Sequence, residues 1–463
     1  MTNSPTLDVR NPSTGELFTS ISADTMDSAT AKMDAAFKLF KSPEKHLALH
    51  ERIALLEKLV AHLEANRSEF IDTMIQEGGK PRRDSIVEFD RALEGVKLSI
   101  GAVSEHAGSS IPLGYQANSS GRIATTRVFP RGVVLAFSAF NHPLNLIVHQ
   151  IIPAFATGCP CLVKPSGDTP MSCLLLVKAM HAVGIPSDYV QAVIPTERAI
   201  STMLVENEKI AFFSFIGSAR VGWMLRSSLH PGVRCALEHG GVAPCVVSSK
   251  ADLNVAVSAI LKGGFYHAGQ VCVSTQRVYV DASVMDDFIK LFKAGAESLK
   301  VGNAFDEDTQ VGPLIREAEV ERVQTWVDEA ISEGAECLVG GKAIDERFFP
   351  PTVLLNPSSE SKVSRQEIFG PVVCVYSYDD FETALQLANH DEVAFQSAIF
   401  SDDINEVMRA FEMVEASALM VNDHTAFRDD VMPFAGLKSS GLGVGGIPYT
   451  VEEMQYEKML VLK

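Results

Sequence analysis

The first hundred residues carry hydrophobic side chains at the three- and four-residue spacing of helix faces. One such face is formed by Ile53, Leu56, Leu59, Val60 and Leu63, with charged residues on the opposite side. A second pattern follows through Val87, Phe89, Leu93 and Val96. The spacing predicts amphipathic helices in this part of the chain.

From about residue 120 the pattern changes to short strands. Residues 122–129 alternate between apolar and polar side chains and predict an exposed strand outside the main core. Mostly apolar runs then begin at residues 132, 161, 190, 212 and 235, with helical stretches between them. Apolar strands that alternate with helices are typical of a parallel sheet covered on both faces, so we expect an α/β layout of the dinucleotide-binding type.

A second set of strands and helices follows residue 241. Its strands are expected near residues 245, 277, 351, 371, 397 and 418, and we place a domain boundary near residue 240. The chain ends in the short apolar strand 459–462, which needs a partner because an unpaired strand edge promotes aggregation. We expect this strand and the strand at 122–129 to pair across subunits.

Composition narrows the class of protein. The 463 residues can form two or three domains with complete cores, and the net charge of −18 repels both nucleic acid and an anionic membrane. The uncharged stretch 132–163 is interrupted by polar residues and prolines, which disfavours a membrane span. The eight cysteines form no CxxC pair, and the first residues lack the features of a signal peptide. We expect a cytoplasmic protein with reduced thiols, no metal site, and no nucleic-acid or membrane partner.

Three polar side chains are candidates for chemistry. Cys272 stands in a loop before a strand, the kind of position from which a thiol attacks a substrate, although a structural role is open. Glu238 ends an apolar strand at a glycine pair, where it lies either at a cleft or simply at the surface. Asn141 also follows a strand, and its amide either faces a ligand or caps the helix after Pro143.

Two further segments favour a dinucleotide. Lys164 follows a strand, and the loop 216–222 carries Gly217 and Gly222 at the entry to a helix. The free N–H groups and the dipole of a helix N-terminus favour a pyrophosphate. Such a glycine spacing alone is weak evidence, because many helices begin in this way.

Taken together, the motifs are specific. In chain order they read FNHP, LVKPS, FSFIGS, LEHGG, GQVC, QEIFGPVV and MPFAGLKSSGLG. With them the sequence resembles the aldehyde dehydrogenase superfamily over nearly its whole length, and Cys272 follows Glu238 by the family's interval of 34 residues. The segment 421–443 is similar to the branch that acts on lactaldehyde-like and phosphonoacetaldehyde-like substrates.

The resemblance implies NAD(P)-dependent oxidation of an aldehyde to a carboxylate. In the family, the cysteine that Cys272 matches adds to the aldehyde to form a thiohemiacetal. The Asn141 side chain and the Cys272 backbone N–H correspond to the oxyanion donors. Glu238 matches the base that activates the water for thioester hydrolysis and can also help to deprotonate the thiol.

The resemblance also implies a cofactor site for NAD or NADP. Lys164 matches a contact to the adenosine ribose, Ser218 a contact to the pyrophosphate, and Glu367 and Phe369 the pair at the nicotinamide ribose and ring. The remaining residues that we assign to this site are Ser166, Gly167 and Gly217.

Some positions depart from the family pattern. Gly167 stands where NAD-preferring relatives often carry glutamate, so we expect NADP to be accepted at least as readily as NAD. His239 and Val242 replace the residues usual around the paired glycines, and Ala435 replaces a glycine. Possible contacts for an anionic substrate group are His106, His142, His424 and Arg428.

The implied fold is an aldehyde dehydrogenase-like α/β structure. Its Rossmann-type cofactor domain comprises residues 1–109 and 131–240, and its α/β catalytic domain comprises residues 241–441. A small β oligomerisation arm comprises residues 110–130 and 442–463. The resemblance implies a homodimer or a homotetramer.

Three other functions remain possible from the residues. The nearest is a dehydrogenase that passes its thioester to coenzyme A, but such enzymes generally lack a glutamate at the position of Glu238. A cysteine hydrolase would not need the cofactor contacts. A non-catalytic protein on this fold would be expected to have lost Cys272 or Glu238.

Overall fold

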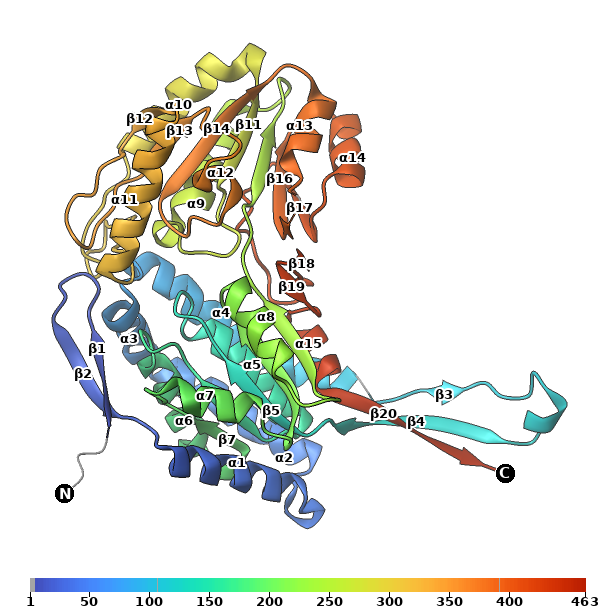
Figure 1. The fold of residues 1–463 in the computed structure, drawn as a ribbon. Coiled ribbons are helices and arrows are strands. Elements are labelled where there is room, and N and C mark those ends of the chain that lie inside the picture. Colours follow the sequence, from blue (N-terminus) through green and yellow to red (C-terminus); the bar gives the residue numbers. More distant parts are fainter. Residues whose placement is uncertain (1–4, 106, 391) are drawn as a thin grey trace.

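The structure is a computed structural model that describes residues 5–105, 107–390 and 392–463. Within these residues two large sheets occupy the two halves of the molecule, and a narrow sheet extends outward from one half (Figure 1). Two short pairings complete the strands: β1 (Thr6–Arg10) with β2 (Leu17–Ser22), and β15 (Val393–Ala394) with β18 (Leu437–Lys438). None of the helices in the described residues is both long and apolar enough to span a bilayer.

The first sheet is built mostly from the apolar runs predicted between residues 132 and 240. Its strands lie in the order β19 (Gly441–Leu442), β9 (Arg234–Glu238), β8 (Ile210–Ile216), β5 (Val133–Phe137), β6 (Cys161–Lys164) and β7 (Val190–Ala192). All neighbours pair in parallel except β19, which runs antiparallel to β9. The predicted parallel sheet is therefore confirmed.

Helices cover both faces of this sheet. Side chains of β5 alternate between two cores, with Val134 and Ala136 on one face and Val133 and Leu135 on the other. The first face packs against α2 (Leu49–Ala65), α3 (Arg67–Gly78), α4 (Arg82–Glu105), α5 (Asn145–Thr157) and α6 (Met171–Ala182). The second packs against α1 (Met26–Phe40), α7 (Arg198–Val205) and α8 (Ala219–Ser227). Burial on both faces explains why these strands are apolar throughout.

The second sheet comes from the residues after 241. Its strands lie in the order β12 (Glu336–Val339), β13 (Thr352–Leu355), β14 (Val372–Tyr378), β11 (Arg277–Asp281), β10 (Pro244–Val247), β16 (Gln396–Phe400) and β17 (Ala418–Val421). Two separate cores lie against it. Its helices are α9 (Leu253–Phe265), α10 (Met285–Glu297), α11 (Glu317–Ser332), α12 (Lys362–Arg365), α13 (Phe381–Ala388) and α14 (Ile404–Met413).

The narrow sheet corrects one prediction. It contains β20 (Gln455–Leu462), β4 (Ile123–Pro130) and β3 (Ser110–Ile111), with β4 in the centre. The terminal strand β20 pairs with all eight residues of β4 in the same chain, and the predicted pairing of these two strands across subunits is wrong. Pairing within the chain satisfies the edge of β4 that the sequence left without a partner.

The C-terminal segment differs from the predicted arm. Before β20 the chain forms α15 (Ile447–Glu453), which packs against α4 and α5 and buries Ile447 and Val451. Strand β19 belongs to the first sheet. In residues 442–463, therefore, only β20 lies in the arm, because the apolar side chains of α15 are buried in the first core.

Candidate active site

The first sheet contains a switch in strand order between β5 and β8. From β5 the chain continues outward through β6 and β7, and then returns to the other side of β5 with β8 and β9. The loops that leave the C-terminal ends of β5 and β8 therefore diverge, and in open α/β sheets such a crevice is where ligands bind. Asn141 and the loop 217–218 lie in these two loops.

A cavity of about 1110 Å³ opens at this switch point and extends to the second sheet. Every residue that the sequence predicted for catalysis or cofactor binding lines it: Asn141, Lys164, Ser166, Gly167, Gly217, Ser218, Glu238, Cys272, Glu367 and Phe369. The first seven come from loops and strand ends of the first sheet, and the last three from loops of the second. The space between the two halves is thus a single candidate site.

Cys272 follows a turn with unusual backbone geometry. His267 and Ala268 have positive φ angles of 47° and 54°, and Gly269 follows at 70°. At Gly269 a Cβ atom would lie 2.1 Å from the carbonyl oxygen of Gly370, so this position requires glycine. Left-handed non-glycine residues persist only where the surroundings hold them, and they cluster at functional sites.

The Cys272 thiol is less accessible than the sequence suggested, because it is half-buried. Burial raises its pKa well above the usual value, and the nearby carboxylates of Glu238 and Glu367 raise it further. The free thiol is therefore protonated at neutral pH and needs a base before it can attack.

Glu238 is the last residue of β9, where the strand reaches the cavity. Burial raises the pKa of its carboxyl to about 7, against the lowering effect of Arg428 and Arg91. A carboxylic acid with a pKa near 7 exists in both forms at neutral pH, as a general base requires.

Asn141 faces the loop that leads to Cys272 and does not cap the following helix. Its Nδ2 donates a hydrogen bond of 2.9 Å to the backbone oxygen of Gln270. The cap residue of α5 is Leu144, and no side chain of its own caps the helix. Because an amide NH₂ has two N–H groups, the second one of Asn141 is available to a ligand in the cavity.

The cofactor part of the cavity has features that fit a dinucleotide. Ser218 precedes α8 without capping it through its side chain, which leaves backbone N–H groups of the helix start for a ligand. Among the described residues, the buried Oε1 atom of the half-buried Glu367 has no hydrogen-bond partner. Beside it, a Cβ on Gly240 would lie 1.7 Å from that oxygen, so glycine keeps this space open. A ribose hydroxyl fits both observations.

His239, which departs from the family pattern, forms a hydrogen bond to the loop at Gly217. Its Nδ1 lies 2.8 Å from the Gly217 carbonyl oxygen, and since a carbonyl only accepts, Nδ1 carries the proton. The ring lies between Phe215 and Trp223. His239 therefore ties the candidate pyrophosphate loop to the end of β9.

No sequence pattern predicted the long charged side chains that reach the cavity from helices. Arg91 of α4 and His149 of α5 both contact Asp430, at 2.6 and 2.9 Å. Arg322 of α11 lowers the pKa of Glu367, which burial raises to about 8. Charged residues on amphipathic helices are normally solvated, so only burial in three dimensions identifies these as part of the site.

Four residues were candidates for contacts to an anionic group. His106 lies outside the described residues. His142 lines the cavity, but burial lowers its pKa well below the usual value, so its ring is neutral. Burial also lowers the pKa of His424. Arg428 lines the cavity, and although burial lowers its pKa to about 10, it is charged at neutral pH.

Comparison with known proteins assigns the family. The family model described as "Aldehyde dehydrogenase family" matches residues 1–460. The chain belongs to this family. The chain is 37% identical over 440 residues to the 3-sulfolactaldehyde dehydrogenase of Priestia megaterium, covering 95% of this chain and 90% of that protein. It is 36% identical over 464 residues to the lactaldehyde dehydrogenase of Methanocaldococcus jannaschii, covering 99% and 98%.

A solved structure agrees over the whole chain. The glyceraldehyde-3-phosphate dehydrogenase GapN of Methanocaldococcus jannaschii, in complex with NADP, superposes with a TM-score of 0.94 at 35% identity and covers 100% of both chains. The aldehyde dehydrogenase fold inferred from the sequence motifs is confirmed. This aldehyde dehydrogenase oxidises an aldehyde to a carboxylic acid with NAD or NADP as its cofactor.

Proposed function

We propose that Cys272 is the nucleophile, that Asn141 and the Cys272 backbone N–H bind the oxyanion, and that Glu238 activates the hydrolytic water. The observation that carries this assignment is the opening of all three side chains into one cavity, with a pKa near 7 at Glu238. The six-stranded sheet then forms the cofactor domain and the seven-stranded sheet the catalytic domain.

The chemistry divides between these groups in order. Glu238 or another base takes the thiol proton of Cys272, the sulfur bonds to the aldehyde carbon, and the oxygen gains the electron pair of the C=O bond. The N–H groups of Asn141 and Cys272 stabilise that charge. A nicotinamide held at Glu367 and Phe369 would supply the hydride acceptor, and when the oxyanion collapses the Cys272 sulfur keeps the acyl group as a thioester. Glu238 takes a proton from water, which attacks the thioester, breaks the C–S bond and releases the carboxylic acid.

This arrangement supports hydrolysis and not transfer to coenzyme A. Glu238 is present, ends its strand at the cavity, and carries a carboxyl whose pKa burial raises to about 7. Release of the thioester by a thiol would need no carboxylate base at this place. The acylating alternative is therefore disfavoured.

For the cofactor we propose that Lys164 and Ser166 contact the adenosine ribose, with Gly167 leaving space for a 2′-phosphate. Apart from its two neighbours in the chain, no described residue has a heavy atom within 4 Å of a Cβ at Gly167. Asp168, the next carboxylate, lies 3.5 Å from Arg316. Arg198 and Arg220 also line the cavity. Positive groups together with an open position favour the phosphate of NADP.

Gly167→Glu is expected to shift the enzyme toward NAD. The wild type should have a kcat/KM for NADP at least equal to that for NAD. The added carboxylate accepts the 2′-hydroxyl of NAD and repels the phosphate, a change worth about 10- to 100-fold in the ratio. Steady-state kinetics with both cofactors measure it, with Gly167→Gln as the uncharged control. A wild type that prefers NAD tenfold, unchanged by the glutamate, would show that this position does not control the choice.

We propose that the substrate is a small 2-hydroxyaldehyde with an anionic group at its far end. Arg428 stacks on Phe434, with its guanidinium carbon 4.4 Å from the ring centre, and its Nη1 donates to the Met432 oxygen at 2.7 Å. No described residue accepts a hydrogen bond from its buried Nη2. A sulfonate or carboxylate in the cavity would satisfy this donor. Both relatives compared above are named for 2-hydroxyaldehydes, and the substrate named for one of them, 3-sulfolactaldehyde, also carries an anionic sulfonate.

Replacing Arg428 with methionine should reduce discrimination between 3-sulfolactaldehyde and lactaldehyde, which differ in the sulfonate. The ratio of their kcat/KM values is expected to fall about 10- to 100-fold, because a charge-assisted hydrogen bond is lost. The assay should run above pH 8, since loss of Arg428 also raises the pKa of Glu238. Arg428→Lys keeps the charge and is expected to retain part of the ratio. An equal loss for both aldehydes would contradict the proposal.

We also propose that the arm mediates a homodimer or homotetramer and that the enzyme is cytoplasmic. Strand β20 leaves large apolar side chains exposed, including Met459 at 57% and Leu460 at 55%. Exposed apolar strands of this kind are typical of interfaces. All eight cysteines are free thiols, as expected in a reducing compartment.

A further inference from the structure

We propose that Glu88 is a positioning residue for Asn141. This inference rests on the proposed role of Asn141 as an oxyanion donor. Glu88 lies on α4, outside the sheet and fully buried, and it is not among the residues that line the cavity. It acts through the first turn of α5.

Glu88 replaces the missing cap of α5. One of its oxygens, Oε1, accepts hydrogen bonds from the backbone N–H groups of Leu144 and Asn145, at 2.9 and 3.1 Å. The Leu146 N–H donates to the His142 oxygen at 3.1 Å, so the turn that Glu88 holds begins directly after Asn141. A shift of this turn would therefore move Asn141.

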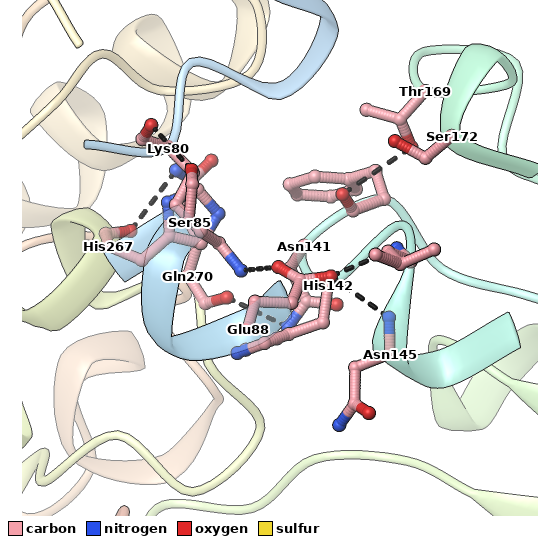
Figure 2. A network of polar contacts seen from close by, with 12 residues as sticks. Lys80, Ser85, Glu88, Asn141, His142, Asn145, Thr169, Ser172, His267 and Gln270 are labelled. Carbon is pink, nitrogen blue, oxygen red and sulfur yellow. Dashed lines mark hydrogen bonds and ion pairs between the residues drawn. The ribbon is translucent and has the colours of Figure 1, made fainter. Parts of the chain in front are cut away.

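The loop that precedes Cys272 holds the other side of Asn141. Its amide donates to the Gln270 oxygen, and the Gln270 side chain donates to the Pro313 oxygen at 3.2 Å and accepts from the Ile315 N–H at 3.0 Å. Figure 2 shows Asn141 between Gln270 and the helix start that Glu88 contacts. Contacts therefore hold Asn141 on both sides, through Gln270 on one and through the start of α5 on the other, and Glu88 supplies the contacts at α5.

A buried ion pair holds the Glu88 carboxylate in place. Its second oxygen, Oε2, forms an ion pair with the ammonium of Lys80, and the exposed fraction of each side chain is 1% or less. One turn earlier on α4, the buried Asp84 lies near the backbone N–H of His267, in the left-handed turn before Cys272, and this N–H lowers the pKa of Asp84 against the raising effect of burial. Helix α4 therefore holds the Asn141 side through Glu88 and also lies close to the turn before Cys272.

A second buried carboxylate provides a matched comparison. Glu77 accepts the backbone N–H groups of Met171 and Ser172 at the start of α6, in the way that Glu88 caps α5. Helix α6 carries no residue that we place at the reacting atoms. A loss of the cap at Glu77 should affect stability in the same way without acting through Asn141.

The experiment compares two double variants, Lys80→Met with Glu88→Gln, and Lys80→Met with Glu88→Leu. Both remove the buried charges, but only glutamine keeps an oxygen for the two N–H groups. We expect kcat of the leucine form to be at least about 10-fold lower, with KM for aldehyde and cofactor changed much less, because small misplacements of a catalytic group are costly. Thermal unfolding and circular dichroism confirm that both forms are folded.

The same pair is then made in the Asn141→Ala background. If Glu88 acts through Asn141, the glutamine and leucine forms of Glu88 should have equal kcat values in the Asn141→Ala background, because the effects of coupled residues are not additive. The control pair Glu77→Gln and Glu77→Leu should show the same ratio in both backgrounds. Equal kcat values in the two Glu88 forms, or a difference that survives without Asn141, would overturn the inference.

The background variant separates this inference from the proposed function. Asn141→Ala alone is expected to lower kcat by about 10²-fold, the usual effect of losing one oxyanion donor. An unchanged kcat would overturn the oxyanion role of Asn141, and the role of Glu88 with it. A lowered kcat together with identical Glu88 forms would overturn the role of Glu88 alone.

Discussion

Cys272→Ala is expected to lower aldehyde oxidation by at least about 10⁴-fold while the protein still binds NADP. The substitution removes the sulfur that forms the covalent intermediate, and the side chains that we assign to the cofactor lie on other loops. Formation of reduced cofactor, followed by its absorbance, measures the loss, and isothermal titration calorimetry measures the binding of NADP.

The matched control is Cys235→Ala. Cys235 is also half-buried and free, but it lies within β9 and does not line the cavity. This variant should retain activity. Substantial turnover by Cys272→Ala, or an equal loss in both variants, would show that Cys272 is not the nucleophile.

Glu238→Gln is expected to produce about one reduced cofactor per active site and then to stall. Hydride transfer precedes the hydrolysis that needs the base, so the thioester accumulates. Steady-state turnover should fall by about 10²- to 10⁴-fold, the usual contribution of a general base. Rapid-mixing absorbance measures the burst, and mass spectrometry of the stalled enzyme measures the acyl group on Cys272.

The burst rate also tests where the thiol proton goes. Burial and two carboxylates raise the pKa of Cys272, so its proton must be removed before attack. A burst as fast as in the wild type means that another base removes it, whereas a slow burst assigns this step to Glu238 too. Glu367→Gln, a neighbouring carboxyl that we assign to the cofactor, should show no stall after one turnover. A Glu238→Gln enzyme with normal steady-state turnover would refute the role of the base.

Ionisation of Glu238 also predicts the pH profile of the wild type. Burial raises the pKa of this carboxyl to about 7, so it is protonated and inactive as a base below that pH and ionised above it. Where hydrolysis limits turnover, kcat should rise as the pH increases through about 7 and then level off. The residual turnover of Glu238→Gln should lack this rise.

Local patterns predicted most of the regular structure. The helix face predicted through Leu56, Leu59 and Leu63 lies on α2, and the apolar runs after residue 132 became β5 to β9, because buried parallel strands and helix faces differ in their spacing. The hairpin of β1 and β2 was missed. So was β19, since Gly441 and Leu442 stand in a glycine-rich stretch, and only their pairing with β9 makes them a strand. The alternating apolar and polar side chains at 122–129 indicated an exposed strand that needs a partner strand. They did not indicate whether the same chain or another subunit supplies that partner, which is β20 of the same chain.

The residues of the site also fall into a group that the sequence predicted and a group that it did not. Strand-end residues such as Asn141 and Glu238 could be found, because the topology of a parallel sheet brings its C-terminal strand ends together. Arg91, Arg322 and Glu88 could not be found, since each lies on a helix whose sequence pattern gives a charged residue no reason to be buried. Their contacts join segments far apart in the chain, as between Arg91 and Asp430. The sequence showed no signal for them beyond their charge.

The pairing of β19 with β9 constrains how the protein is assembled during synthesis. Glu238 lies on a strand whose outer neighbour is residues 441–442, and α15, which completes the core beneath α4 and α5, follows at residues 447–453. During synthesis, all strands of the seven-stranded sheet are therefore made before the last strand of the six-stranded sheet, although the six-stranded sheet begins earlier in the chain. Until residues 441–442 leave the ribosome, the strand that carries Glu238 has an open edge, and a cut near residue 240 would not divide the protein into two pieces that each fold alone.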